Sequence, residues 1–134
     1  MPPFSTQLSE FNGNPMLVIL CNGQPWGATY PTDPEFQFGK NKARMILAIR
    51  DLLDHFNRTE GQNADQIQQG IPSVPGLTHP LKVQGFLGFE GPGGRYIDKP
   101  ILKLQSGQTK LSLGVTKAQA LLYVWKDIEA FANS

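Results

Sequence analysis

The stretch FQFGKNKARMILAIRDLLDHF, residues 36–56, aligns without a gap on LSLGVTKAQALLYVWKDIEAF, residues 111–131. Gly39 matches Gly114 and Lys42 matches Lys117 just before the apolar part of each copy. Apolar residues then recur at the 3-4-3 spacing of one helix face. They are Ile46, Ile49, Leu53 and Phe56 in the first copy and Leu121, Val124, Ile128 and Phe131 in the second. The pattern predicts an internal repeat whose copies both end in an amphipathic helix.

Short extended segments separated by turn residues precede each predicted helix. In the first half they lie near 4–11, 15–21, 26–30 and 35–38, before a helix over 39–57. In the second half they lie near 81–90, 94–97, 100–105 and 109–114, before a helix over 115–132. Asn22-Gly23 and Ser106-Gly107 supply the positive φ angles that tight hairpins require. The predicted fold class is α+β: an internal duplication of a ββββα unit, with two antiparallel sheets and two amphipathic helices packed about a pseudo-two-fold axis.

The chain length of 134 residues fits a single domain, residues 1–134. We divide it into a first repeat (1–58), a connecting loop (59–80) and a second repeat (81–134). Each half is too small to bury a core alone, so the two repeats are expected to pack together. The loop is long for a compact domain, which predicts that it is either mobile or functional.

Composition narrows the class of protein further. Hydrophobic residues make up 40% and charged residues 17% of the chain, which is typical of a folded domain. The longest apolar run, Met16 to Cys21, is too short to span a membrane, and the N-terminus carries no export signal. A single cysteine and two histidines allow neither an internal disulfide nor a closed zinc site. We therefore expect a cytoplasmic protein with no membrane partner and no cofactor.

The residues that catalysis needs do not form a recognisable motif. His55 lies beside Asp51 and Asp54 on a predicted helix, and His79 precedes a proline in the loop. Cys21 ends an apolar strand, where a small core residue is expected. The FGKNK segment, residues 38–42, lacks the spacing of a phosphate-binding loop, and the stems of Lys42 and Lys117 are expected to cover the edge of the core. The sequence predicts that the protein is not an enzyme.

The net charge of +1 is unevenly distributed along the chain. Residues 1–38 contain three acidic residues and no lysine or arginine. Two segments are basic: residues 39–58 contain five basic and two acidic residues, and residues 81–117 contain six basic and two acidic residues. If the basic segments share a face, they form a positive patch that suits an anion or a nucleic acid. The alternative is a solvated surface on which both signs are mixed.

Basic and aromatic residues are interleaved on the predicted strands, the combination that binds single-stranded nucleic acid. Cations contact phosphates and exposed rings stack on bases; the alternative is that most of these rings belong to the core. Phe86 and Phe89 accompany the basic residues of the second half. The candidate binding residues are Lys82, Arg95, Tyr96, Lys99, Lys103, Lys110, Trp26 and Tyr30.

The segment TKLSLGVTKAQALLYVWKDIEAF, residues 109–131, resembles the last strand and helix of PUR repeats, and the doubled ββββα plan is similar to the wider PUR/Whirly group. Members of that group bind single-stranded DNA or RNA on curved sheets through basic and aromatic side chains. The resemblance implies this role for Lys99, Lys103 and Lys110. The acidic first half departs from the family pattern.

These observations support two hypotheses of different classes. The first is a non-catalytic protein that binds single-stranded DNA or RNA on its sheet surfaces and that forms a homo-oligomer. The alternative is a protein-binding or assembly module of phage or plasmid type, with no nucleic-acid ligand, that uses the acidic first half or residues 59–80.

Overall fold

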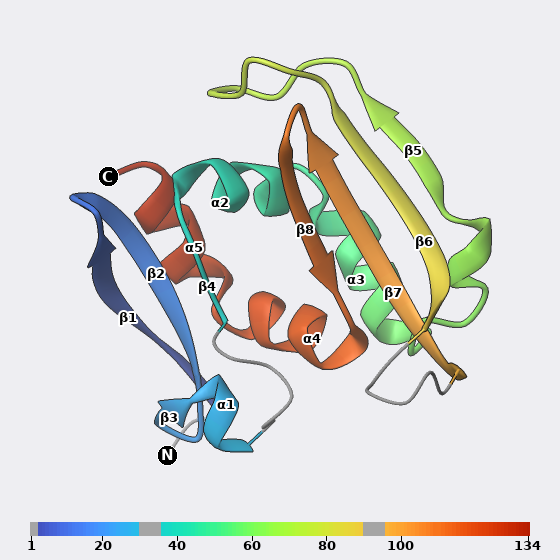
Figure 1. Cartoon of the computed structure of the whole chain (residues 1–134), viewed down its shortest axis with the longest axis horizontal. Helices are drawn as coiled ribbons and strands as arrows, with labels where there is room; N and C mark the ends of the chain where they lie inside the picture. Colours follow the sequence, from blue (N-terminus) through green and yellow to red (C-terminus); the bar gives the residue numbers. More distant parts are fainter. Residues whose placement is uncertain (1–2, 30–35, 90–95) are drawn as a thin grey trace.

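The computed structural model describes residues 3–29, 36–89 and 96–134 and contains two antiparallel sheets of four strands each (Figure 1). In the first sheet, β2 (Asn14–Cys21) pairs with β1 (Phe4–Phe11) on one side and with β3 (Gln24–Pro25) and β4 (Gln37–Phe38) on the other. The second sheet is a meander of β5 (Gln68–Ile71), β6 (Leu81–Phe89), β7 (Tyr96–Ser106) and β8 (Thr109–Leu113). The predicted α+β class is confirmed.

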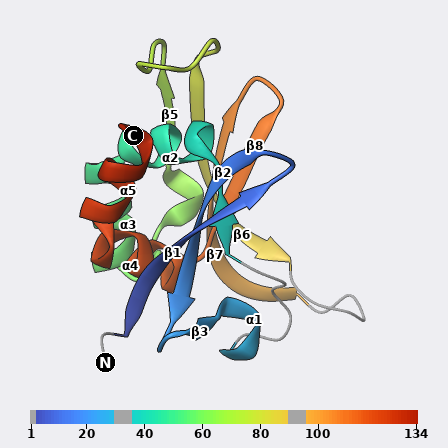
Figure 2. The same ribbon diagram turned by 90° about the vertical axis from the view of Figure 1, so that its left-hand side faces the viewer.

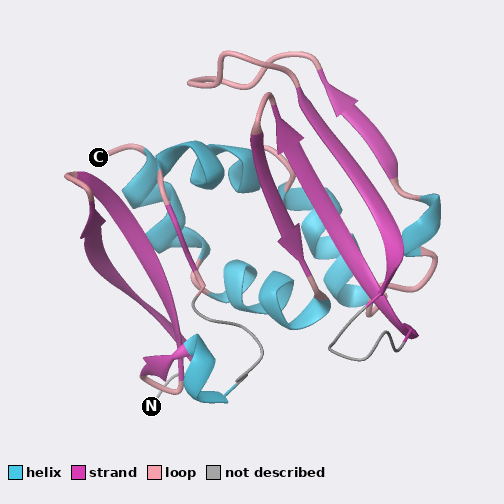
Figure 3. Cartoon of the chain, in the orientation of Figure 1, coloured by secondary structure: helices cyan, strands magenta, loops and turns pink. Residues whose placement is uncertain are grey.

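Four helices occupy the space between the two sheets in Figure 1, and Figure 3 shows the same arrangement by type of element. They are α2 (Lys40–Leu47), α3 (Arg50–Arg58), α4 (Val115–Tyr123) and α5 (Trp125–Ala132). Helix α3 packs on α4 and α2 packs on α5, so each half of the chain contacts the other through its helices. In Figure 2, turned by 90°, the helices lie toward one side of both sheets.

Each of the two predicted helices is in fact two helices with a break between them. Ile49 (φ −119°, ψ 29°) separates α2 from α3, and Val124 (φ −102°, ψ 24°) separates α4 from α5. A positive ψ turns the chain out of the helical path at these two residues. The break falls at matching positions of the two copies, because Ile49 aligns with Val124.

The two halves also match in backbone geometry and strand register. Gly39 and Gly114 precede α2 and α4 with the same extended conformation, φ −87° in both. Strand β2 pairs with β4 through Leu17–Phe38 and Val18–Gln37. Residues 14–20 (NPMLVIL) resemble residues 99–104 (KPILKL), so Leu17 and Val18 correspond to Leu102 and Lys103. These residues of β7 pair with β8 in the same way, Leu102 with Leu113 and Lys103 with Ser112. A duplicated unit requires these matches; superposition of the halves about a two-fold axis stays a prediction.

Among the described residues, the first half has the predicted four strands, β1 to β4, whereas the second repeat has three, β6 to β8; each half ends in two helices in place of the predicted one. Of residues 26–30, predicted as a strand, the first four form helix α1 (Trp26–Thr29), and the last lies outside the described residues. Residues 94–95 of the predicted segment 94–97 lie outside the described residues, and residues 96–97 and 100–105 belong to the single strand β7. Residues 59–80, predicted as a loop, contain the 3-10 helix η1 (Ala64–Gln66) and the edge strand β5.

A close approach of two backbones holds η1 on the second sheet. Gly85 in β6 donates its N–H to the Ile67 carbonyl at 2.9 Å, and a Cβ at position 85 would meet the Ala64 carbonyl oxygen. Ala64 itself is fully buried. Only glycine fits at this point of β6, so the segment between the halves is part of the packed structure.

A single hydrophobic cluster connects the inner faces of both sheets with the four helices. Side chains alternate between the two faces of the second sheet. Leu81 and Val83 in β6 and Leu102 and Leu104 in β7 are buried on the inner face, whereas the intervening Lys82 is exposed on the outer face. Cys21 is a buried free thiol in this core, as predicted. In the part of the chain that the structure describes, no helix has the length and apolar character needed to cross a bilayer.

Candidate nucleic-acid interface

The outer face of the second sheet, which points away from the helices, gathers three of the predicted binding residues. Lys82 pairs with Gln105, which pairs with Lys110, so these residues form one row across β6, β7 and β8. The next row consists of Gln84, Lys103 and Ser112. We call this surface the lysine face; its members are Gln68, Gly70, Lys82, Gln84, Phe86, Ile101, Lys103, Gln105, Lys110 and Ser112.

Sheet geometry determines how far apart the three lysines lie. Adjacent strands are separated by about 4.8 Å, so the backbones of Lys82 and Lys110 are about 10 Å apart on either side of β7. Lys103 is a diagonal neighbour of both, at about 7–8 Å. Lys82 and Lys110 are exposed and Lys103 is half-buried. The three ammonium groups can therefore reach one extended anionic ligand from a single face.

No carboxylate lies on the lysine face, whose other members are glutamine, serine, glycine, phenylalanine and isoleucine. Within residues 3–29, 36–89 and 96–134, no ion pair engages Lys82, Lys103 or Lys110. Neighbouring ammonium groups at this spacing repel each other by a few tenths of a kcal/mol in water. In the described part of the chain no ion pair neutralises these three lysines, so their charge is available to an anion.

Phe86 adds an aromatic ring to the lysine face. It pairs with Ile101 on β7, is a diagonal neighbour of Lys103, and is 36% exposed. Exposed rings on a sheet can stack on bases at about 1–3 kcal/mol per base. Sequence reasoning noted Phe86 among the basic residues but did not carry it into the candidate set. The signal was the shared parity of residues 82, 84 and 86.

Trp26 was predicted to bind nucleic acid and instead belongs to the core. It is 1% exposed, stacks on Phe4 with 6.1 Å between ring centroids, and meets Phe36 edge-on at 5.1 Å. Packing against these two aromatic rings stabilises the corner where α1 leaves the first sheet. The ring cannot stack on a base, so the prediction for Trp26 is wrong.

Four further predicted residues fall wholly or partly outside what the structure describes. Tyr30 and Arg95 lie outside the described residues. The backbones of Tyr96 and Lys99 lie in β7, where Tyr96 pairs with Phe89 and Lys99 with Gly88, and their side chains are not described. Of the predicted binding residues, the structure therefore places Lys82, Lys103 and Lys110 on the lysine face, where Phe86 accompanies them.

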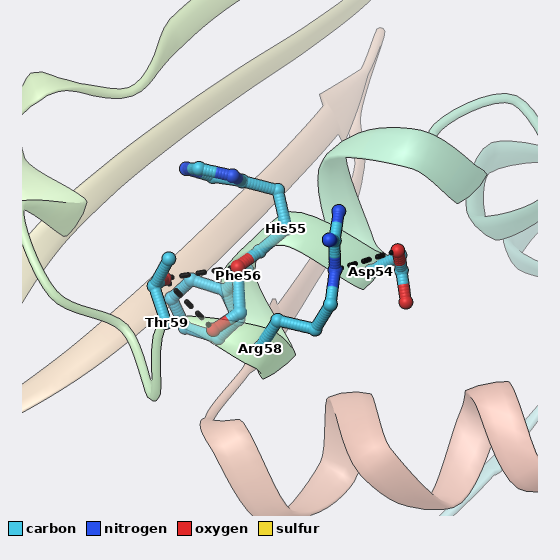
Figure 4. A network of polar contacts seen from close by, with 5 residues as sticks. All are labelled: Asp54, His55, Phe56, Arg58 and Thr59. Atoms are coloured by element: carbon cyan, nitrogen blue, oxygen red, sulfur yellow. Dashed lines mark hydrogen bonds and ion pairs between the residues drawn. The ribbon is translucent and has the colours of Figure 1, made fainter.

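The two histidines considered for catalysis take part in local contacts through their backbone carbonyls and, for His79, through its ring. Figure 4 shows the end of α3, where Arg58 Nε and Asp54 Oδ2 form an exposed ion pair at 2.9 Å and the Thr59 hydroxyl donates to the His55 carbonyl. The side chain of His79 contacts the Thr78 hydroxyl at 3.0 Å, while its carbonyl accepts from Ser106. Among the described residues, no three His, Cys, Asp or Glu side chains are grouped to hold a metal ion.

Lys117, expected to cover the edge of the core, lies with Nζ 5.1 Å from the centroid of the Phe36 ring. Lys40 donates to the Ser134 carbonyl at 2.7 Å. Both lysines are engaged with the protein itself, which separates them from the three lysines of the lysine face.

Comparison with known proteins adds no relative to this picture. No family model, no curated protein and no solved structure matches the chain.

Proposed function

We propose that the protein binds single-stranded nucleic acid on the lysine face, without catalysis. The observation that carries the proposal is the placement of Lys82, Lys103 and Lys110 in two adjacent rows of one open sheet face that holds no carboxylate. Lysines placed in this way neutralise phosphates and release counterions, which is the main source of sequence-independent affinity.

Phe86 and the glutamines make the surface suit a single strand better than a duplex. An exposed ring can stack only on a base that is not enclosed in a helix, and amide side chains can donate to or accept from base edges. The proposed contacts are phosphates on the three lysines and a base on Phe86.

The experiment is a titration of a labelled single strand at low salt, followed by fluorescence anisotropy. We expect the triple variant Lys82→Gln, Lys103→Gln, Lys110→Gln to bind at least about tenfold more weakly than the parent, because three phosphate contacts are lost. A duplex of the same sequence should bind the parent more weakly than the single strand.

The control removes the same amount of charge elsewhere. Arg50, Arg58 and Lys126 are exposed residues of α3 and α5, away from the lysine face, and each is replaced by Gln in the control. We expect the control to bind within about threefold of the parent, because only non-specific attraction is reduced. If both triple variants lost affinity for the single strand equally, binding would depend on net charge alone. That result would contradict a defined site.

A further inference from the structure

The first strand of the chain presents a free edge. Strand β1 pairs with β2 over all eight residues, from Phe4–Cys21 to Phe11–Asn14, and no other described strand pairs with it. Natural edge strands are usually kept apart by lysines, prolines, bulges or short length. β1 has no lysine, no proline and no register shift, and Glu10 is its only charge.

Hairpin geometry shows which groups face that edge. Asn12 and Gly13 form the turn with φ of 51° and 82°, so the flanking pair Phe11–Asn14 is a hydrogen-bonded pair. Such pairs alternate along an antiparallel ladder, so every second residue before Phe11 bonds to β2. The backbone N–H and C=O groups of Thr6, Leu8 and Glu10 therefore point away from β2.

The same strand carries the two most exposed of the large hydrophobic side chains in the described chain. Leu8 is 71% exposed and Phe11 is 62% exposed. Helix α5 covers the inner face of β1 at Thr6, whose hydroxyl donates to Asp127 at 2.8 Å. The half of the strand beyond Thr6 has no such cover.

We propose that β1 pairs with β1 of a second copy of this chain, antiparallel, about a two-fold axis at Leu8. In this register Leu8 faces Leu8 of the partner subunit, and Thr6 and Glu10 exchange backbone hydrogen bonds across the axis. The strand is its own complement, because the outward groups of residues 6, 8 and 10 meet the same groups in reverse order. The first sheet of one copy and the first sheet of the other then join into one continuous sheet.

Two features favour a second copy of the chain as the partner of β1: the position of the charge on the strand, and the part of the strand that α5 covers. The two Glu10 carboxylates lie opposite threonines and about 13 Å apart along the strand, so no like charges meet. The uncovered half of each strand lies beside the half that α5 covers in the other copy, so the two helix layers sit at opposite ends of the paired stretch. This interface does not involve the lysine face, and the proposal does not rest on nucleic-acid binding.

The experiment is sedimentation velocity of the full chain across the micromolar range, without nucleic acid, on parent, Leu8→Lys and Leu8→Glu. An edge-strand interface is at the small end of specific interfaces, so we expect a concentration-dependent dimer of twice 14.8 kDa for the parent. Either variant alone should be monomeric, because two like charges meet at the axis. An equimolar mixture of the two variants should recover the dimer.

Leu87→Lys is the matched control, since Leu87 is 50% exposed on β6 of the other sheet and should leave dimerisation unchanged. Circular dichroism verifies that each variant is folded, as expected for exposed positions. A parent that stays monomeric at every concentration would leave the edge to a different partner and overturn the proposal. A Leu8→Lys dimer of parental strength, or a mixture that stays monomeric, would overturn the register at Leu8.

Discussion

The outer faces of the two sheets carry different side chains, although the strands of the two sheets pair in the same register. Val18 in β2 pairs with Gln37, and Lys103 in β7 pairs with Ser112, at matching points of the two ladders. Around Val18 the outer face is uncharged: half-buried Met16 and Leu20 are its neighbours on β2, and Gln7 and Gln37 pair with it across the sheet. Around Lys103 it carries charge and amides. The comparison shows that the ladder fixes where a side chain points, while the side chain itself decides whether the face is closed or open to a ligand.

The helices that pack on the inner faces of the two sheets should not differ in this way. Shortening a buried side chain there should have the largest effect on stability. Leu53 on α3 and Ile128 on α5 occupy matching positions, and both are 0% exposed. We expect Leu53→Ala and Ile128→Ala each to lower the free energy of unfolding by about 2–5 kcal/mol, through lost burial and a residual cavity. Denaturant titration measures both. A loss below about 1 kcal/mol at either site would break the equivalence of the two helix layers.

Support from η1 is specific to the second sheet and gives the next largest effect. In Gly85→Ala the new methyl group meets the Ala64 carbonyl oxygen, so η1 must move away from β6. We expect a loss of about 1–3 kcal/mol, the usual cost of overpacking. Gly70→Ala on β5, where an added Cβ meets nothing within 4 Å, is the control and should be nearly neutral. Equal stability of the two variants in thermal melts would contradict the contact.

Exchanging the side chains of Val18 and Lys103 tests the difference between the two outer faces directly. Val18→Lys should cost about 1 kcal/mol, because a half-buried aliphatic side chain is replaced by a charge. Lys103→Val should leave stability within about 0.5 kcal/mol and weaken single-strand binding several-fold, through loss of one phosphate contact. Denaturant curves and anisotropy titrations measure the two quantities separately. A gain of affinity in Val18→Lys would show that binding follows net charge and not the lysine face.

The smallest effect is expected at the exposed pair on α3. Asp54 and Arg58 are four residues apart on one helix, and their side chains are 47% and 70% exposed. We expect Arg58→Ala to cost about 0.3–0.5 kcal/mol at low salt and less at high salt. Binding to a single strand should stay within twofold of the parent. A larger loss of binding would place part of the ligand on the helices.

The helical periodicity and the turn residues were sufficient to predict the α+β class and the positions of both helical segments. They could not reveal the breaks at Ile49 and Val124, since the apolar spacing continues through them. Pro100 hid the continuity of β7, because proline within a strand normally indicates an edge or an interruption. It pairs with Leu87, next to the register shift at Gly88 and Phe89.

The candidate site was predictable in part for the same reason. Lysines on strands could be identified from the sequence, and three of them, Lys82, Lys103 and Lys110, lie on one face. Their common face depends on register across β6, β7 and β8, which no single strand contains. Trp26 shows the opposite case. The sequence around an aromatic residue near candidate strands is the same whether its ring stacks on a base or on Phe4. Only the burial of the ring in the structure distinguishes the two.

The salt dependence of single-strand binding tests the central claim most directly. Log affinity is measured against log salt concentration for the parent and for the variant Lys82→Gln, Lys103→Gln, Lys110→Gln. Each lost phosphate contact removes about 0.7 from the slope, so the slope should decrease in magnitude by about 2 between parent and variant. A parent that does not bind at low salt, or two slopes that coincide, would contradict the assignment of the lysine face to nucleic acid.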